Sequence, residues 1–236
     1  MTRDAAMPSL TPAAVARAMD HAVLKPEYTG ADLARHAAVC VELGVGCLCV
    51  RSVDVAAASR LLAGTPVVVA SVVGFPHGAQ RPEVKAREAA LAIADGAREL
   101  DMVMAIGGFL SGDHAAVRDD IAAVVREARP ARAVVKVILE TCLLSGVQIA
   151  AACRLAEEAG ADFVKTSTGF GPGGATPEAV RVMLDTVGGR LEVKASGGIR
   201  TWDDAVRYLD MGCTRIGVGD AAAILDGGPA TGDAAY

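Results

Sequence analysis

The chain has 236 residues, of which 52% are hydrophobic and 22% are charged, and its formal net charge is −5 at pH 7. This length and composition suffice for one large core of the size found in single-domain α/β barrels. The acidic balance argues against nucleic acid or an acidic membrane surface as a partner, because either would normally require a basic patch.

The first residues, MTRDAAMPSLTP, contain no basic stretch followed by an apolar one, and no apolar run reaches the length of a membrane span. We therefore expect a cytoplasmic protein. Its six cysteines are scattered through apolar segments without CxxC spacing, which favours buried thiols over disulfides or a zinc site. The four histidines are equally dispersed, so the sequence predicts neither a metal ion nor another cofactor.

Short runs rich in β-branched residues alternate along the chain with longer alanine-rich stretches whose apolar residues recur every three to four positions. The short runs predict eight strands, over Asp20–Leu24, Gly46–Val50, Val67–Val73, Leu100–Met104, Ala133–Leu139, Asp162–Lys165, Glu192–Ala195 and Thr214–Val218. Such alternation is typical of βαβ units and a parallel sheet. Eight strands at this spacing favour a (β/α)8 TIM barrel over an open doubly wound sheet.

The stretches between the strands predict helices over Gly30–Leu43, Asp54–Leu62, Arg81–Gly96, Asp113–Ala128, Ser145–Ala159, Thr176–Val187 and Trp202–Met211. Several have a capping hydroxyl at the start or a glycine at the end. No linker rich in proline or serine divides the chain, so residues 1–236 are expected to form one domain. A short extension of about residues 1–10 would precede the barrel, and a mobile tail of about residues 227–236 would follow it.

Charged residues stand inside several of the predicted strands, where a barrel interior would normally hold branched aliphatic side chains. They are Lys165 in FVKTSTG, Lys194 in EVKASGG, Asp101 in ELDMVM and Lys136 in VVKVILE. An isolated strand lysine is usually a solvated rim residue. Two lysines on neighbouring strands, each followed by Ser or Thr and Gly, favour a functional role, because barrel active sites lie at the carboxyl ends of the strands.

Two lysines that lie close together have a chemical use. A free lysine has a pKa of about 10.4, so its neutral, nucleophilic form is rare at neutral pH, and a neighbouring cation together with partial burial favours that form. A neutral amine can attack an aldehyde or ketone to form a Schiff base, while a carboxylate relays the protons. Lys165, Lys194 and Asp101 supply this set, and Lys136 is a weaker candidate for contact with the reacting group.

Glycine-rich segments follow the last two predicted strands. They contain Gly197 and Gly198 in one loop and Gly217 and Gly219 in the other. In barrels the backbone N–H groups of these two loops often bind phosphate. The glycines could instead serve only tight turns, but their place after strands seven and eight favours the phosphate interpretation.

Taken together, FVKTSTGFGPGGATPE, EVKASGGIRT, ELDMVM, SVVGFPHG, VKVILET and MDHAVLKP resemble the deoxyribose-phosphate aldolases, in order and over nearly the whole chain. The resemblance implies a metal-independent class I aldolase that cleaves 2-deoxyribose 5-phosphate to glyceraldehyde 3-phosphate and acetaldehyde, as in deoxynucleoside catabolism. It also implies a homodimer.

Motif by motif, the Schiff-base lysine of that family falls on Lys165, its second lysine on Lys194 and its proton-relay aspartate on Asp101. Gly169 of KTSTG, with the four loop glycines, falls among the substrate-binding residues. The final Tyr236 resembles a C-terminal tyrosine that some members fold over the site.

The chain departs from the family pattern around the substrate. Ala22 and Ala105 replace the threonine of DHT and the asparagine of DMVIN, Arg51-Ser52 stands in place of the Asn-Pro of VCVNP, and Gly219-Asp220 replaces the two serines of IGTSS. A carboxylate facing a phosphate would repel it. We hypothesise that Arg51 pairs with Asp220 or contacts an anion itself, shifting preference toward a different or unphosphorylated aldehyde. Each change alone fits neutral drift equally well.

Two further readings stay open at the level of sequence. One is a barrel that binds sugar phosphate without turnover, although such a protein has no need of two close lysines and an acid. The other is a phosphosugar isomerase or a different barrel lyase, which the fold alone does not exclude.

Overall fold

The computed structural model describes residues 10–227. The expected C-terminal tail with Tyr236, apart from Gly227, and nearly all of the expected N-terminal extension lie outside the described residues. Eight strands form one closed barrel in the order β1 to β8, with every neighbouring pair parallel. Their bounds are Met19–Val23, Cys47–Val50, Val68–Val73, Glu99–Val103, Val134–Ile138, Phe163–Lys165, Glu192–Ser196 and Arg215–Val218. The predicted TIM barrel is thus confirmed.

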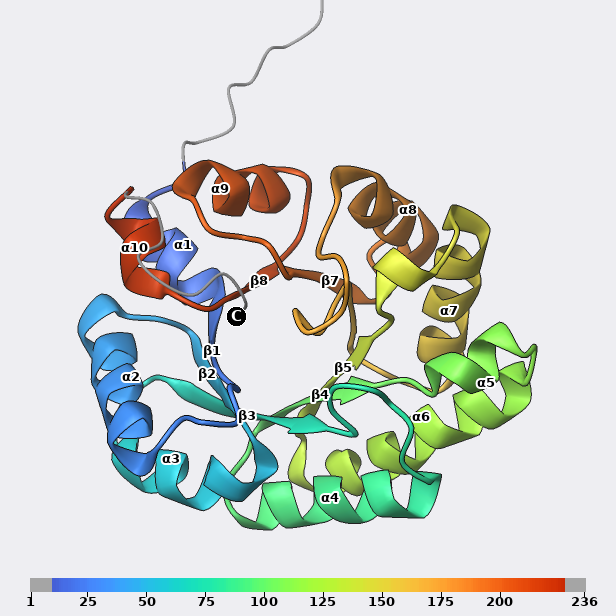
Figure 1. The fold of residues 1–236 in the computed structure, drawn as a ribbon, viewed down its shortest axis with the longest axis horizontal. Helices are drawn as coiled ribbons and strands as arrows, with labels where there is room; N and C mark the ends of the chain where they lie inside the picture. The colour runs from blue at the N-terminus through green and yellow to red at the C-terminus, as the bar shows by residue number, and fades with distance from the viewer. Residues whose placement is uncertain (1–9, 228–236) are drawn as a thin grey trace, which may run out of the picture.

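The helices form a ring around the barrel (Figure 1). They are α1 Pro12–Ala18, α2 Gly30–Leu43, α3 Val55–Leu61, α4 Pro82–Ala94, α5 Ile106–Leu110, α6 His114–Ala128, α7 Gly146–Glu158, α8 Pro177–Val187, α9 Trp202–Asp210 and α10 Ala221–Leu225, with 3-10 turns at Ser52–Asp54, Arg129–Ala131 and Thr141–Leu143. All seven predicted helices are present. The sequence did not predict α1, α5 and α10, because five to seven residues are too few to show helical periodicity.

Local capping explains where the longer helices begin. The Thr29 hydroxyl accepts a hydrogen bond from the Asp32 N–H, and the Asp32 carboxylate accepts one from the Thr29 N–H, which forms a capping box before α2. Ser145 and Gln148 form the same motif before α7. Because each helix starts at a fixed residue, the strand that precedes it ends at a fixed place on the barrel rim.

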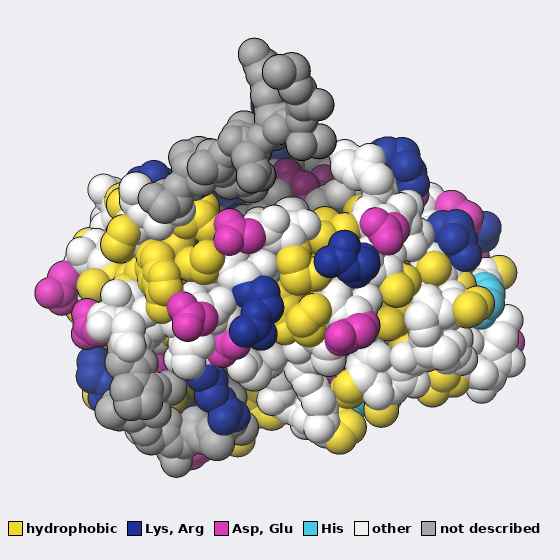
Figure 2. All heavy atoms as spheres, turned by 90° about the horizontal axis from the view of Figure 1, so that it is seen from above, with side chains coloured by type: hydrophobic (Ala, Val, Ile, Leu, Met, Phe, Trp, Pro, Cys, Tyr) yellow, Lys and Arg dark blue, Asp and Glu magenta, His cyan; other side chains and the backbone are white. Residues whose placement is uncertain are grey.

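The hydrophobic core lies mainly between the barrel and its helices. Outward-facing strand residues such as Leu48, Leu100, Val137 and Val164 pack there, all fully buried. Figure 2 shows the side that carries α8 and α9, where charged side chains alternate with hydrophobic ones. Among residues 10–227, none of the helices combines the length and apolar character needed to cross a bilayer.

The barrel interior is divided into two halves. A small apolar cluster of β1, β2 and β3 contains Ala22, Leu24, Cys47, Cys49, Ala70 and Val72. The inward positions of β4 to β8 instead carry most of the buried charges of the molecule. Burying charges inside a barrel costs free energy unless every charge is paired. Because a purely structural interior would avoid this cost, the charged half is the candidate functional site.

Candidate active site

Strand register brings the predicted catalytic residues together. Lys165 lies beside Lys194 across β6 and β7, and Asp101 lies beside Lys136 across β4 and β5. Register-paired residues of parallel strands point to the same face of the sheet. All four side chains point into the barrel and are at most 1% exposed.

Asp101 is the common acceptor of the three lysines. Its Oδ2 accepts hydrogen bonds from Lys165 Nζ at 2.8 Å and from Lys194 Nζ at 2.6 Å, and its Oδ1 accepts one from Lys136 Nζ at 2.8 Å. Lys165 and Lys194 therefore share one carboxylate oxygen. A proton can pass between the two amines through that oxygen alone.

Burial and pairing act in opposite directions on these groups. Burial by itself favours the protonated form of Asp101, but the ammonium groups of Lys136, Lys165 and Lys194 hold the pKa of this carboxyl well below its usual value. Burial likewise disfavours the charged form of Lys194, yet Asp101 and Asp20 raise its pKa above the usual lysine value. The sequence argument invoked a neighbouring cation and partial burial, whereas in the structure carboxylates lie between the lysines and keep Lys194 protonated.

A second layer of charges lies below Asp101. Lys136 Nζ contacts Glu99 Oε2 at 2.5 Å and Asp20 Oδ2 at 3.2 Å. Arg215 donates to both of these acids, to Asp20 Oδ1 and to Glu99 Oε1, and Lys194 donates to Asp20 Oδ2. Together, three carboxylates and four cationic side chains form one connected network inside the barrel.

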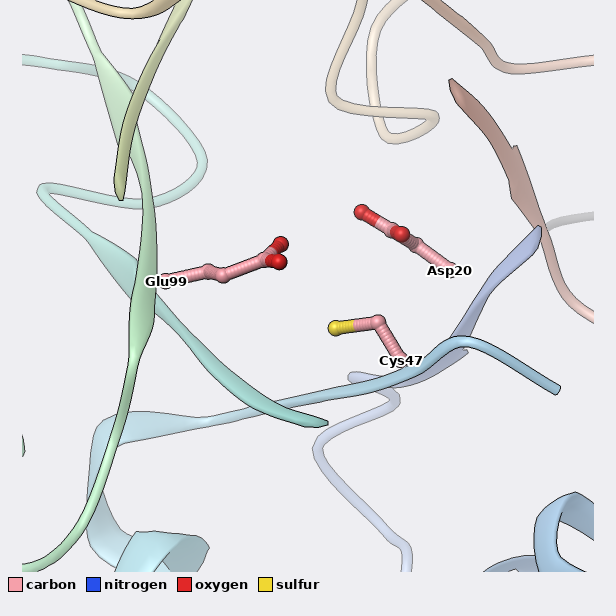
Figure 3. Close-up of side chains that lie close together, drawn as sticks. All are labelled: Asp20, Cys47 and Glu99. Atoms are coloured by element: carbon pink, nitrogen blue, oxygen red, sulfur yellow. The ribbon is translucent and has the colours of Figure 1, made fainter. Parts of the chain in front are cut away.

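Asp20, Glu99 and the Cys47 thiol converge in this lower layer (Figure 3), and their ligand atoms lie within 4.8 Å of one another. Such a set could hold a metal ion by distance alone. The Lys136 ammonium lies against both acids, and burial raises the pKa of the Cys47 thiol well above its usual value, which disfavours a thiolate ligand. We therefore assign Asp20 and Glu99 to the ion-pair network, with the neutral Cys47 thiol beside them.

The sequence analysis did not single out Asp20, Glu99 or Arg215. A signal was available for Glu99, because it stands two residues before Asp101 in ELDMV and side chains alternate along a strand, so both must face the same way. Arg215 and Asp20 begin or nearly begin their strands and are separated by 195 residues along the chain. Only closure of the barrel brings them together.

The loop that follows Lys165 is held by buried hydrogen bonds. The Thr168 hydroxyl donates to Glu140 Oε2 at 2.5 Å, and the Thr168 N–H also points to the Glu140 carboxylate. The Thr166 hydroxyl donates to the Ser196 carbonyl and accepts from the Ser196 N–H, each at 2.9 Å. These contacts lock the segment after β6 to the segment after β7.

Comparisons with known proteins agree on one family. The sequence profile described as DeoC/LacD family aldolase matches residues 14–218. A curated deoxyribose-phosphate aldolase of Mycolicibacterium paratuberculosis is 53% identical over 222 residues, covering 92% of this chain and 98% of the relative. The chain belongs to the DeoC/LacD aldolase family. This confirms the resemblance drawn from the sequence motifs and makes the protein an aldolase.

Other members of the family give the same result. A deoxyribose-phosphate aldolase of Clostridium perfringens is 47% identical, with 90% of this chain and 95% of the relative covered. The solved structure of the tetrameric deoxyribose phosphate aldolase of Aeropyrum pernix superposes with a TM-score of 0.86 at 34% identity, covering 92% of this chain and 91% of that one.

The substrate end of this aldolase differs from the expected arrangement at Arg51. Its Nε donates to Asp54 at 2.6 Å, and its Nη atoms donate to the carbonyls of Lys25, Pro26 and Tyr28. Asp220 instead caps α10 by accepting from the Ala223 N–H at 3.0 Å. The expected pairing of Arg51 with Asp220 is therefore wrong, because Arg51 is engaged in holding the loop after β1.

The predicted glycines lie in the loops after β6, β7 and β8, except for Gly217, which lies within β8 near its carboxyl end. Gly169, Gly197 and Gly198 have φ angles of 85°, 83° and 79°, a region that side chains with a Cβ rarely adopt. Gly217 is buried opposite Ser196, and Gly219 follows β8 directly. Conformation alone thus accounts for three of the glycines, whereas Gly217 is paired within the barrel sheet.

The apolar half of the interior completes the site. Ala22 belongs to the cluster formed with Cys47, Cys49 and Val72, and Phe75 packs against its upper edge. The Phe75 ring meets Phe170 edge to face, with the ring centroids 5.2 Å apart. Phe75 follows β3 and Phe170 follows β6, so the pair joins two separate rim loops. The site therefore has a charged side and an apolar side.

Proposed function

We propose that this aldolase cleaves 2-deoxy-D-ribose 5-phosphate reversibly to D-glyceraldehyde 3-phosphate and acetaldehyde through a Schiff base on Lys165. One observation carries the proposal: Lys165 and Lys194 donate to the same oxygen of Asp101 inside a barrel where all three are at most 1% exposed. The choice of substrate follows the Mycolicibacterium and Clostridium relatives, both of which are named deoxyribose-phosphate aldolase.

The charge of the network supports a neutral nucleophile. Four cationic side chains face three carboxylates, so the fully ionised network carries one excess positive charge. The cations are Lys136, Lys165, Lys194 and Arg215, and the acids are Asp20, Glu99 and Asp101. An uncompensated charge in a buried site is unfavourable. Release of one lysine proton balances the network and leaves an amine that can attack a carbonyl.

Covalent bond formation begins with that amine. Neutral Lys165 adds to the C1 aldehyde of the open-chain sugar, and the resulting carbinolamine loses water to give an iminium ion. Lys194, held protonated by Asp101 and Asp20, is the donor for the departing hydroxyl.

The iminium ion then draws electrons from the C2–C3 bond. The C3 hydroxyl gives up its proton to a base of the network, C2–C3 breaks, and the three-carbon aldehyde leaves with the phosphate. Protonation of the remaining enamine at C2 and addition of water release acetaldehyde and restore Lys165. Asp101, in contact with both amines, is placed to carry protons in each step.

Borohydride trapping tests the covalent step. Acetaldehyde followed by borohydride should add one two-carbon unit to the intact mass of the protein, and Lys165→Ala should abolish it. Lys25→Ala, which removes a lysine of the loop after β1, should retain the adduct. If the unmodified protein gives no adduct with either acetaldehyde or the sugar phosphate, the barrel binds without turnover or acts on another carbonyl.

The phosphate is proposed to bind to backbone N–H groups at the carboxyl ends of β7 and β8 and in the loops that follow them, at Gly197, Gly198, Gly217 and Gly219. The Asp220 carboxylate lies at the end of the second loop, where it caps α10. A carboxylate there repels a dianion. We therefore propose a weaker preference for phosphorylated over unphosphorylated sugar than two serines at positions 219 and 220 would give, with Asp220 as the residue responsible and Arg51 as a loop-holding residue.

Replacing Asp220 tests this preference. Asp220→Ser keeps a side-chain oxygen that can cap α10 but removes the charge, so we expect the ratio of kcat/KM for 2-deoxyribose 5-phosphate to that for 2-deoxyribose to rise about tenfold. Asp226→Ser, a change of charge beyond the end of α10, is the matched control and should leave the ratio unchanged. An unchanged ratio in Asp220→Ser would contradict the proposal.

The substrate is a small molecule whether the sugar is phosphorylated or not. We propose that the protein works as a homodimer in the cytoplasm. In support, the exposed hydrophobic side chains Val41 and Leu61 lie on α2 and α3, two helices that pack against each other. The Aeropyrum relative is described as tetrameric. Light scattering on the purified protein distinguishes the two assemblies by mass.

A further inference from the structure

Arg215 and Glu99 take no part in the chemical steps proposed above. Each is the first residue of its strand, β8 and β4, so both lie at the opposite end of the barrel from the catalytic loops. The Arg215 side chain is 17% exposed and that of Glu99 is 7% exposed. Arg215 donates to two buried acids, Asp20 and Glu99, at this amino-terminal end of the barrel interior, which we call the floor.

A continuous series of contacts runs from this floor to Lys165. Arg215 Nη2 donates to Glu99 Oε1, and Glu99 Oε2 lies 2.5 Å from Lys136 Nζ. Lys136 donates to one oxygen of Asp101 at 2.8 Å, and Lys165 donates to the other oxygen at the same distance. Cations and anions alternate at every step. A change of charge at the floor is therefore transmitted to the amine at the top.

We propose that Glu99 and Arg215 are positioning residues that set the number of protons held by the buried lysines, and with it the pH at which Lys165 becomes nucleophilic. The inference rests on the proposed Schiff-base function. Arginine does not lose its proton in proteins, so Arg215 is a permanent charge. The network has one more cation than it has carboxylates, and Arg215 cannot lose its charge. One of the lysines must therefore release a proton for the network to reach charge balance.

Among residues 10–227, few titratable or charged groups face the three lysines from the surrounding strands. They are Asp20 of β1, Cys47 and Cys49 of β2, Glu99 and Asp101 of β4, and Arg215 of β8, whereas β3 contributes Ala70 and Val72. Burial raises the pKa of both thiols, so they stay neutral near pH 7. The three carboxylates and Arg215 alone therefore decide the charge around the lysines.

Opposite changes of charge should shift the pH profile in opposite directions. Arg215→Gln leaves three lysines balanced by three carboxylates, so all three hold their protons and the acid limb of kcat/KM moves to higher pH. Glu99→Gln increases the positive excess, and the limb moves to lower pH. Each shift should be about one pH unit. The double variant should return the limb close to its original position.

The experiment measures kcat/KM from about pH 5 to about pH 10, together with borohydride trapping at each pH. Arg215→Lys, which keeps the charge, should keep the limb in place. Asp120→Asn is the matched control, because it removes the carboxylate partner of a buried lysine, Lys85, outside the barrel interior. It should also keep the limb in place even if it lowers stability.

If Arg215 and Glu99 had only a structural role, their variants would lose activity, but the acid limbs of their pH profiles would not move in opposite directions. Limbs that stay in place, or that move the same way in Arg215→Gln and Glu99→Gln, overturn the inference. If Arg215→Gln does not fold, Glu99→Gln decides alone: an acid limb that moves to lower pH supports the inference, and a limb that stays in place overturns it. Trapping separates the two proposals, because an adduct at Lys165 with unshifted limbs contradicts only this inference. No adduct at any pH contradicts the Schiff-base function and the inference with it.

Discussion

Asp101 is the residue on which the site converges, since it accepts hydrogen bonds from three lysines while fully buried. A buried carboxylate with this many cationic donors is a structural link, and in the proposed mechanism it also carries protons. These two roles have different measurable consequences. Removing its charge should weaken the fold and, independently, slow the chemistry.

Asp101→Asn should lower kcat by about 10²- to 10⁴-fold, the usual contribution of a general acid or base. It should also cost about 3–5 kcal/mol of unfolding free energy, because buried lysines lose a partner. Steady-state kinetics and urea unfolding measure the two effects. Asp120→Asn breaks another buried lysine–aspartate pair, at 2.7 Å, and should reduce stability with little loss of kcat. Equal losses of kcat in both variants would assign the effect to stability alone.

At the scale of elements, the loops after β6 and β7 behave as one unit. The Ala175 N–H lies 3.0 Å from both the Ser196 and the Gly197 carbonyl oxygens, next to the hydrogen bonds between Thr166 and Ser196. Glycine is required for this close approach. A Cβ on Gly174 would lie 2.2 Å from the Gly197 carbonyl oxygen.

Gly174→Ala should therefore separate the two loops and displace the backbone N–H groups proposed to bind phosphate. We expect KM for the phosphorylated sugar to rise at least about tenfold, with about 1–3 kcal/mol lost from the unfolding free energy. Kinetics and thermal unfolding measure these changes. Gly30→Ala is the control, since a Cβ there meets no atom within 4 Å. Unchanged kinetics in Gly174→Ala would mean that the loops are not coupled.

For the whole molecule, buried ionisable groups make folding depend on pH. Burial and the neighbouring His36 lower the pKa of His21 to about 3, so the folded chain keeps this imidazole neutral where the unfolded chain protonates it. Unfolding free energy must then fall as pH decreases from about 6.5 toward 3. The pKa of Asp101 is also depressed, because its three lysine partners outweigh burial, so its stabilising effect is lost only at still lower pH.

His21→Gln should flatten the pH dependence of stability between about pH 6.5 and pH 4. The wild-type chain should lose about 1.4 kcal/mol per pH unit in this window from His21 alone. Urea unfolding at several pH values measures the slope. His77→Gln, at an exposed site, should leave it unchanged. A slope that is the same in His21→Gln and wild type would show that His21 is not the responsible group.

The sequence by itself determined the elements, the family and most of the charged residues that face the barrel interior from β4 to β7. Periodicity located every strand to within one residue at each end, because inward and outward positions alternate along short segments. Lysines inside strand patterns were visible because a packed barrel normally excludes them. The family followed from motifs around Lys165 and Lys194, and the comparisons confirmed it.

Tertiary structure decided which charges meet. Arg51 was expected to pair with Asp220 or to contact an anion, but it binds Asp54 and the loop after β1, since a long side chain can reach several partners and local sequence does not select one. Asp20 reaches Lys194 and Arg215 across 174 and 195 residues of chain. Such contacts depend on barrel closure and strand register, which no local pattern encodes, and they place Lys165 in one connected network of buried charges.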